Sequence, residues 1–109
     1  MIYQKTVEGN FDEIVERITQ GIMSSRTGYS VTEEANYQTH GHKVAVRMIQ
    51  HFASTIGERV ALQLTFIQQD DEQVEVCGIA SGFEGLLFLH SPSGQKEAIE
   101  TLKKITEEL

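Results

Sequence analysis

Two histidines separated by one residue, His40 and His42, are the first feature of the sequence that could carry chemistry. On a β-strand, residues two apart point to the same side, and imidazole nitrogens suit zinc or copper. A metal site needs a third and usually a fourth ligand, and the candidates His51, Cys77 and His90 all lie elsewhere in the sequence. Because glycine between two polar residues is typical of a turn, we expect a turn here, rank metal binding below it, and expect no cofactor.

The single cysteine, Cys77, could act as a nucleophile, but its neighbours favour a structural role. It lies between Val76 and Gly78 in an alternating apolar segment, whereas a reactive thiol needs an exposed, electropositive setting beside a base. The acidic run at residues 70–72 lacks the spaced ligands and central glycine of a calcium loop, so we expect a solvated hairpin tip. Neither feature predicts a catalytic or cation-binding centre.

A glycine-containing segment at residues 81–85, with the sequence Ser-Gly-Phe-Glu-Gly, could line a binding site. Glycine permits backbone conformations and close approaches that other residues do not, and Phe83 would be costly to leave in water. Two interpretations stay open: a bulged turn with Phe83 in the core, or a mobile lip over one face of a sheet. The spacing is not that of a phosphate-binding loop.

Strands and helices predicted from the apolar pattern must position these residues. Alternating side chains predict strands near residues 2–8, 29–39, 43–52, 60–68, 73–80 and 86–90. Helical spacing predicts one helix after the N-cap Asn10 and a second after Pro92. The order β-α-β-β-β-β-β-α predicts a single α+β domain over residues 1–109, in which two helices pack on one face of a mostly antiparallel sheet of five or six strands.

The opposite face of this sheet is expected to lack a helical cover. If Val44, Val46 and Met48 face the helices, six apolar residues are among those left on the uncovered face, which comprises Arg47, Ile49, His51, Gln63, Thr65, Ile67, Glu75, Cys77, Ile79, Leu87 and Leu89. Coiling of the sheet, a second copy of the chain, or a groove for a small molecule or peptide could bury such a face.

The resulting candidates for ligand or interface contacts are Arg47, Ile49, His51, Gln63, Ile67, Glu75, Cys77, Ile79 and Phe83. The polar members could give a ligand its specificity, although a ladder of cross-strand polar pairs is the simpler interpretation.

The charge and composition exclude several classes of partner. The formal net charge is −7 and the nine basic residues are scattered, which argues against nucleic acid and against anionic membrane surfaces. No apolar run is long enough to span a membrane, and the N-terminus lacks the apolar stretch of a signal peptide. We therefore expect a cytoplasmic protein in which the cysteine stays a thiol.

Three segments together resemble a known family: Ala45-Val46-Arg47, the run Gly57-Glu58-Arg59-Val60-Ala61-Leu62, and Ile79-Ala80-Ser81-Gly82. With Gly9-Asn10-Phe11-Asp12-Glu13 at the start of the first helix, the whole chain is similar to short uncharacterised bacterial proteins grouped as a domain of unknown function of about this length. That family has a Gly-Gly pair near residues 82–83, which Phe83 interrupts here. The resemblance implies a cytosolic bacterial protein and no established activity.

Three functional hypotheses follow from these observations. The first is a non-enzymatic interaction domain that forms a homo-oligomer through the uncovered sheet face. The second is a carrier of a small apolar or amphipathic ligand, with its pocket between that face and residues 81–85; the strand-helix-sheet-helix order resembles that of helix-grip ligand binders, which is an analogy of fold alone. The third is a small enzyme, which requires two of Arg47, His51, Glu75 and Cys77 to meet in a concave site.

Overall fold

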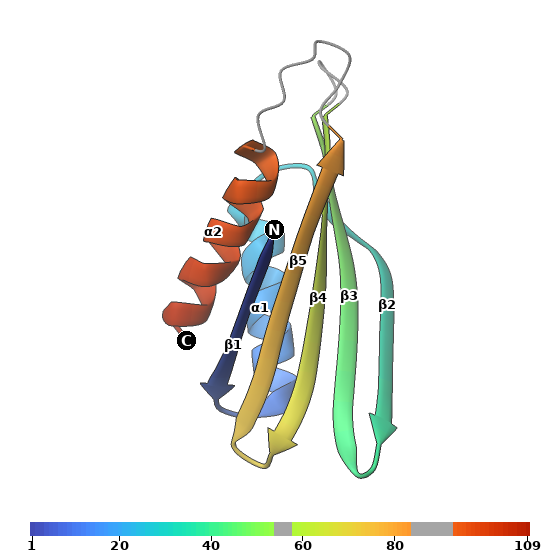
Figure 1. Cartoon of the computed structure of the whole chain (residues 1–109), viewed down its shortest axis with the longest axis vertical. Coiled ribbons are helices and arrows are strands. Elements are labelled where there is room, and N and C mark those ends of the chain that lie inside the picture. The colour runs from blue at the N-terminus through green and yellow to red at the C-terminus, as the bar shows by residue number, and fades with distance from the viewer. Residues whose placement is uncertain (54–57, 84–92) are drawn as a thin grey trace.

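The computed structural model describes residues 1–53, 58–83 and 93–109, which form one sheet and two helices (Figure 1). In chain order the elements are β1 (Ile2–Glu8), α1 (Phe11–Ser25), β2 (Tyr29–Thr39), β3 (His42–Ala53), β4 (Glu58–Asp70), β5 (Gln73–Phe83) and α2 (Ser93–Glu107). The strands pair antiparallel throughout, in the spatial order β1-β5-β4-β3-β2. The predicted α+β class is confirmed, and the strand predicted at residues 86–90 lies outside the described residues.

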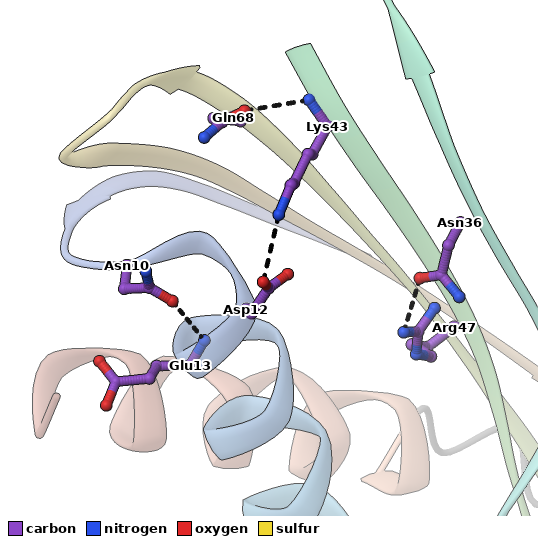
Figure 2. A network of polar contacts seen from close by, with 7 residues as sticks. All are labelled: Asn10, Asp12, Glu13, Asn36, Lys43, Arg47 and Gln68. Carbon is purple, nitrogen blue, oxygen red and sulfur yellow. Dashed lines mark hydrogen bonds and ion pairs between the residues drawn. The ribbon is translucent and has the colours of Figure 1, made fainter.

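Helix α1 begins where the sequence places its cap. The Asn10 side chain accepts a hydrogen bond from the backbone N–H of Glu13 at 3.0 Å, which satisfies one free donor of the first turn (Figure 2). The helix runs through Gly21 without interruption. A Cβ at this position would lie 2.9 Å from Ile105 Cδ1, so the glycine lets α1 and α2 pack closely against each other.

Both helices pack on the same face of the sheet, which we call the covered face. A continuous cluster of buried side chains joins Ile18 and Ile22 of α1 and Leu102 of α2 to the sheet, whose contribution includes Leu62, Leu64, Phe66, Val74 and Val76. Leu102 also fixes the distance of α2 from β5, because a Cβ on Gly78 would lie only 2.2 Å from its Cδ2 atom. The predicted placement of both helices on one face is therefore confirmed.

Strand β3 presents the face opposite to the one predicted from its sequence. Ile49 pairs with Leu62, and Arg47 pairs with Leu64, so both project to the covered face, where Ile49 is fully buried. His51, which pairs with Val60, also belongs to the covered side. The prediction that Arg47, Ile49 and His51 lie on the uncovered face is wrong. Apolar residues occupy both alternating sets of β3, and a one-residue shift in pairing exchanges the faces of a strand.

Two connections between strands show how the sheet is set. His40 and Gly41 have φ angles of 51° and 81° between the paired residues Thr39 and His42, as a two-residue hairpin of type I′ requires. The predicted bulged connection from residue 81 onward is wrong for residues 81–83, because β5 continues to Phe83 in regular pairing with β4. The side chain of Phe83 and residues 84–85 lie outside the described residues.

Candidate functional site

The side of the sheet opposite the helices carries three complete cross-strand rows, which we call the open face. Each row takes one residue from every strand, and pairing from β2 through to β1 identifies the rows as Tyr37, Val44, Ile67, Glu75 and Thr6; Ala35, Val46, Thr65, Cys77 and Gln4; and Glu33, Met48, Gln63, Ile79 and Ile2. In the part of the chain that the structure describes, neither helix lies against this face.

The open face is mostly apolar and is exposed to solvent. Nine of its side chains are apolar: Ile2, Ala35, Tyr37, Val44, Val46, Met48, Ile67, Cys77 and Ile79. Among these, Ile2 is 64% exposed, Tyr37 54%, Ile79 45% and Ile67 36%. Single exposed apolar residues are ordinary on protein surfaces, whereas a contiguous set of this kind marks an interaction surface.

Charge on the open face is limited to two carboxylates. The rows contain Glu33 and Glu75 and neither lysine nor arginine. Glu75 accepts hydrogen bonds from the side-chain amides of Gln4 on β1 and, at 2.8 Å, Gln69 on β4. These amides hold the carboxylate in place without neutralising its charge, because both partners are uncharged.

A hollow of about 320 Å³ adjoins the open face beyond Met48 and Ile79. Its lining residues come from the ends of β3, β4 and β5: Gln50, His51, Arg59, Val60, Ala61, Ser81 and Gly82. Gln50, Ala61 and Ser81 pair with one another across the strands, so their side chains share the side of the open face. The small side chains of Ala61 and Ser81 leave the space that the longer Gln50 and Arg59 border.

Arg47 ties the edge strand β2 to β3 on the covered side (Figure 2). Its guanidinium group donates to Asn36 Oδ1 at 2.8 Å and to the backbone oxygen of Ala35 at 3.2 Å, and it lies 3.5 Å from a carboxylate oxygen of Glu34. The Arg47 side chain is only 12% exposed. Nearby, Lys43 pairs with Asp12 at 3.2 Å, which links β3 to the start of α1 (Figure 2). These contacts assign Arg47 a structural role.

His51 is also held by structural contacts. It is 6% exposed, its ring centroid lies 4.8 Å from that of Tyr29, and its Nε2 atom lies 3.2 Å from the carbonyl oxygen of Thr27. Since a carbonyl can only accept, Nε2 carries the proton in this contact. The histidine thereby fixes the connection between α1 and β2.

The residues proposed for an enzyme do not meet in one place. Arg47 and His51 belong to the covered side of β3, whereas Glu75 and Cys77 project from β5 on the open face. Among the described residues, no hydrogen bond or ion pair joins any two of these four. The arrangement therefore provides no acid-base or nucleophile-base pair from this set.

His40 and His42 lie in and beside the hairpin turn, as the predicted turn requires. His42 Nδ1 lies 2.8 Å from the carbonyl oxygen of Gln68 and so donates to β4. Within residues 1–53, 58–83 and 93–109, no group of three His, Cys, Asp or Glu side chains is placed to hold a metal ion. In the same residues, no helix has the length and apolarity that a membrane crossing requires.

Tyr3 on the covered face is the one group with a resolved shift in acidity. Burial raises the pKa of the Tyr3 phenol above its usual value of 10.0, and the negative charge of Glu107 raises that pKa further. The hydroxyl group is buried and has no hydrogen-bond partner. The folded protein thus favours the neutral phenol.

The sequence identified part of the open face and missed the rest. Gln63, Ile67, Glu75, Cys77 and Ile79 lie there, and their functional role remains a prediction. The residues missed are Ile2, Ala35, Tyr37, Val44, Val46 and Met48. Alternation within β3 could not identify its outward set, because both sets are apolar, and the faces of β1 and β2 depend on pairing with distant strands.

Comparison with known proteins gives a family and no activity. No curated protein is detectably similar to this chain. The family match extends over residues 1–109, and it confirms the predicted resemblance to a domain of unknown function. The chain therefore belongs to DUF6054, a family of unknown function.

Proposed function

We propose that this protein is a non-enzymatic interaction domain that self-associates by packing the open faces of two copies against each other. The observation that carries the proposal is the exposed apolar set on a sheet whose other side is already covered by two helices. Two sheets that pack face to face interdigitate their side chains at a separation of ~10 Å. A second copy would thus give the open face the apolar environment that the helices give the covered face.

The size of the face suits a small, specific interface. Five strands ~4.8 Å apart make a layer ~24 Å wide, and seven residues, the length of β1, extend it by ~23 Å. The flat projection is then ~550 Å², and the relief of the side chains makes the accessible area larger. Stable interfaces bury ~600–1,000 Å² on each partner, so the open face reaches the lower part of this range.

The edges of the sheet are less suited to association than its face. The edge strand β2 has an irregular register between Val31 and Glu33, and two adjacent acids, Glu33 and Glu34, lie on it. Irregular pairing and charge on an edge strand discourage the addition of another strand. This supports contact through the face and opposes extension of the sheet.

The proposal is tested by the oligomeric state of two matched variants. Ile67 on the open face and Leu109 at the C-terminus are both 36% exposed, so Ile67→Lys and Leu109→Lys add the same charge at equally exposed positions. We expect sedimentation of the wild-type chain at ~50 µM to give a dimer, because interfaces of this size commonly have dissociation constants of ~1 µM or lower. Ile67→Lys should weaken the dimer at least ~10-fold, while Leu109→Lys should leave it intact.

Circular dichroism would verify that both variants keep the helix content of the wild type. A wild-type chain that remains monomeric at ~50 µM, or equal loss of the dimer in both variants, would contradict the proposal.

A second candidate function is supported by the hollow beside the open face. Its volume of about 320 Å³ would accommodate a small ligand, and the side chains of Gln50, Arg59 and Ser81 supply polar contacts around the small Ala61. Such a ligand would be amphipathic, since it would reach from these polar groups onto the apolar face. Ala61→Phe should fill the hollow: loss of a ligand that copurifies with the wild-type chain would support this function, and its retention would argue against it.

A further inference from the structure

We infer that self-association is regulated by charge at Glu75, so that loss of this negative charge promotes association; the inference rests on the proposed function. Glu75 lies on the open face and is half buried even before a second copy is added. A face-to-face dimer would remove two such carboxylates from water, one from each copy. The charged form therefore opposes the same contact that the surrounding apolar side chains favour.

The surroundings of Glu75 offer no positive charge to offset this cost. On β1, Thr6 lies directly opposite, Gln4 donates a hydrogen bond, and the next outward residue is the acidic Glu8. On β4, Ile67 lies directly opposite and Gln69 donates a hydrogen bond. Along β5 the neighbours on this side are Gln73 and Cys77, and no helix packs against it in the described part of the chain.

A second copy supplies no cation either, because the rows of the open face contain only Glu33 and Glu75 as charged residues. Each copy also has a formal net charge of −7, so association brings two acidic molecules together. Salt screens repulsion of this kind, and protonation of a buried carboxylate removes its desolvation cost. The dimer consequently takes up protons as it forms, and its affinity rises as the pH falls.

The effect of Glu75 can be separated from that of the whole charge by two isosteric variants. Glu75→Gln and Glu16→Gln remove the same charge, but Glu16 is exposed on α1, away from the open face. We expect sedimentation at pH 7 to give a dimer dissociation constant at least ~10-fold lower for Glu75→Gln than for the wild type. For Glu16→Gln the change should remain below ~2-fold.

The pH and salt dependence provides a second readout. Between pH 7.5 and pH 5.5 the wild-type dissociation constant should fall more steeply than that of Glu75→Gln, which lacks the titrating group. Equal constants for wild type and Glu75→Gln, or equal strengthening by Glu16→Gln, would overturn the regulatory role while leaving self-association in place. If wild type and both variants are monomeric throughout, the proposed function itself fails.

Discussion

The two faces of this sheet differ in what completes them. On the covered face, large aliphatic side chains and Phe66 are fully buried under α1 and α2, and the charged Arg47 and Lys43 lie toward the β2 edge with their own acidic partners. On the open face, apolar residues alternate with Thr, Gln and two carboxylates, and several isoleucines stay exposed. The comparison indicates that the covered face supplies the stability of the fold, while the open face is available for binding.

The largest expected effect separates two isoleucines that the alternating pattern of the sequence had placed on the same face. Ile49 is 0% exposed on the covered face and Ile79 is 45% exposed on the open face. Ile49→Ala should lower the free energy of unfolding by ~2–5 kcal/mol through lost burial and cavity formation. Ile79→Ala should cost less than ~1 kcal/mol at concentrations where the chain is monomeric. Urea unfolding measures both, and equal costs would contradict the assignment of faces.

Arg47 gives the next largest expected effect, because it ties β2 to the rest of the sheet. Arg47→Met keeps the apolar stem but removes the hydrogen bonds to Asn36 and Ala35, and should cost ~1–3 kcal/mol of unfolding free energy. Gln63→Met on the open face is the control and should cost less than ~0.5 kcal/mol. Hydrogen exchange should become faster in β2 for the arginine variant alone. Unchanged exchange in β2 would remove its assigned role.

The hairpin turn that sets the pairing of β2 and β3 gives a smaller effect. His40 has a φ of 51°, a conformation that asparagine tolerates and that a β-branched residue resists. His40→Val should therefore lower the free energy of unfolding by ~1–2 kcal/mol, whereas His40→Asn should leave it unchanged or raise it slightly. Thermal or urea unfolding distinguishes the two variants, and similar values for both would argue against the type I′ geometry.

The smallest effect at neutral pH belongs to the unpaired hydroxyl of Tyr3. Tyr3→Phe removes a buried group without a partner, so the free energy of unfolding should stay constant or rise by up to ~1 kcal/mol. Because the pKa of Tyr3 is higher in the folded state than its ordinary value of 10.0, its contribution is complete below pH 10.0 and is lost as the pH rises through the folded pKa.

The stability gap between Tyr3→Phe and wild type should therefore widen above pH 10.0 in favour of phenylalanine. Tyr37→Phe, at a position 54% exposed on the open face, is the control and should show no such widening. A gap that stays constant with pH would show that the phenol at position 3 does not titrate differently in the folded chain.

The sequence predicted the elements well because their signals are local. The cap at Asn10, the helical spacing of apolar residues and the alternation in β4 and β5 each depend on neighbours a few residues apart. The face of β3 and the surroundings of Arg47 and His51 depend on how β3 pairs with β2 and β4, and no single segment encodes that pairing. The open face was therefore predicted to exist, but with β3 inverted.

The most direct test of self-association follows the open-face methyl groups themselves as the protein concentration changes. In an NMR experiment with a soluble gadolinium chelate, methyl signals broaden in proportion to their access to solvent. The account predicts that Ile67 and Ile79, which are 36% and 45% exposed in the single chain, become protected as the concentration rises, while Leu109 does not. Equal broadening of the isoleucines at every concentration would contradict it.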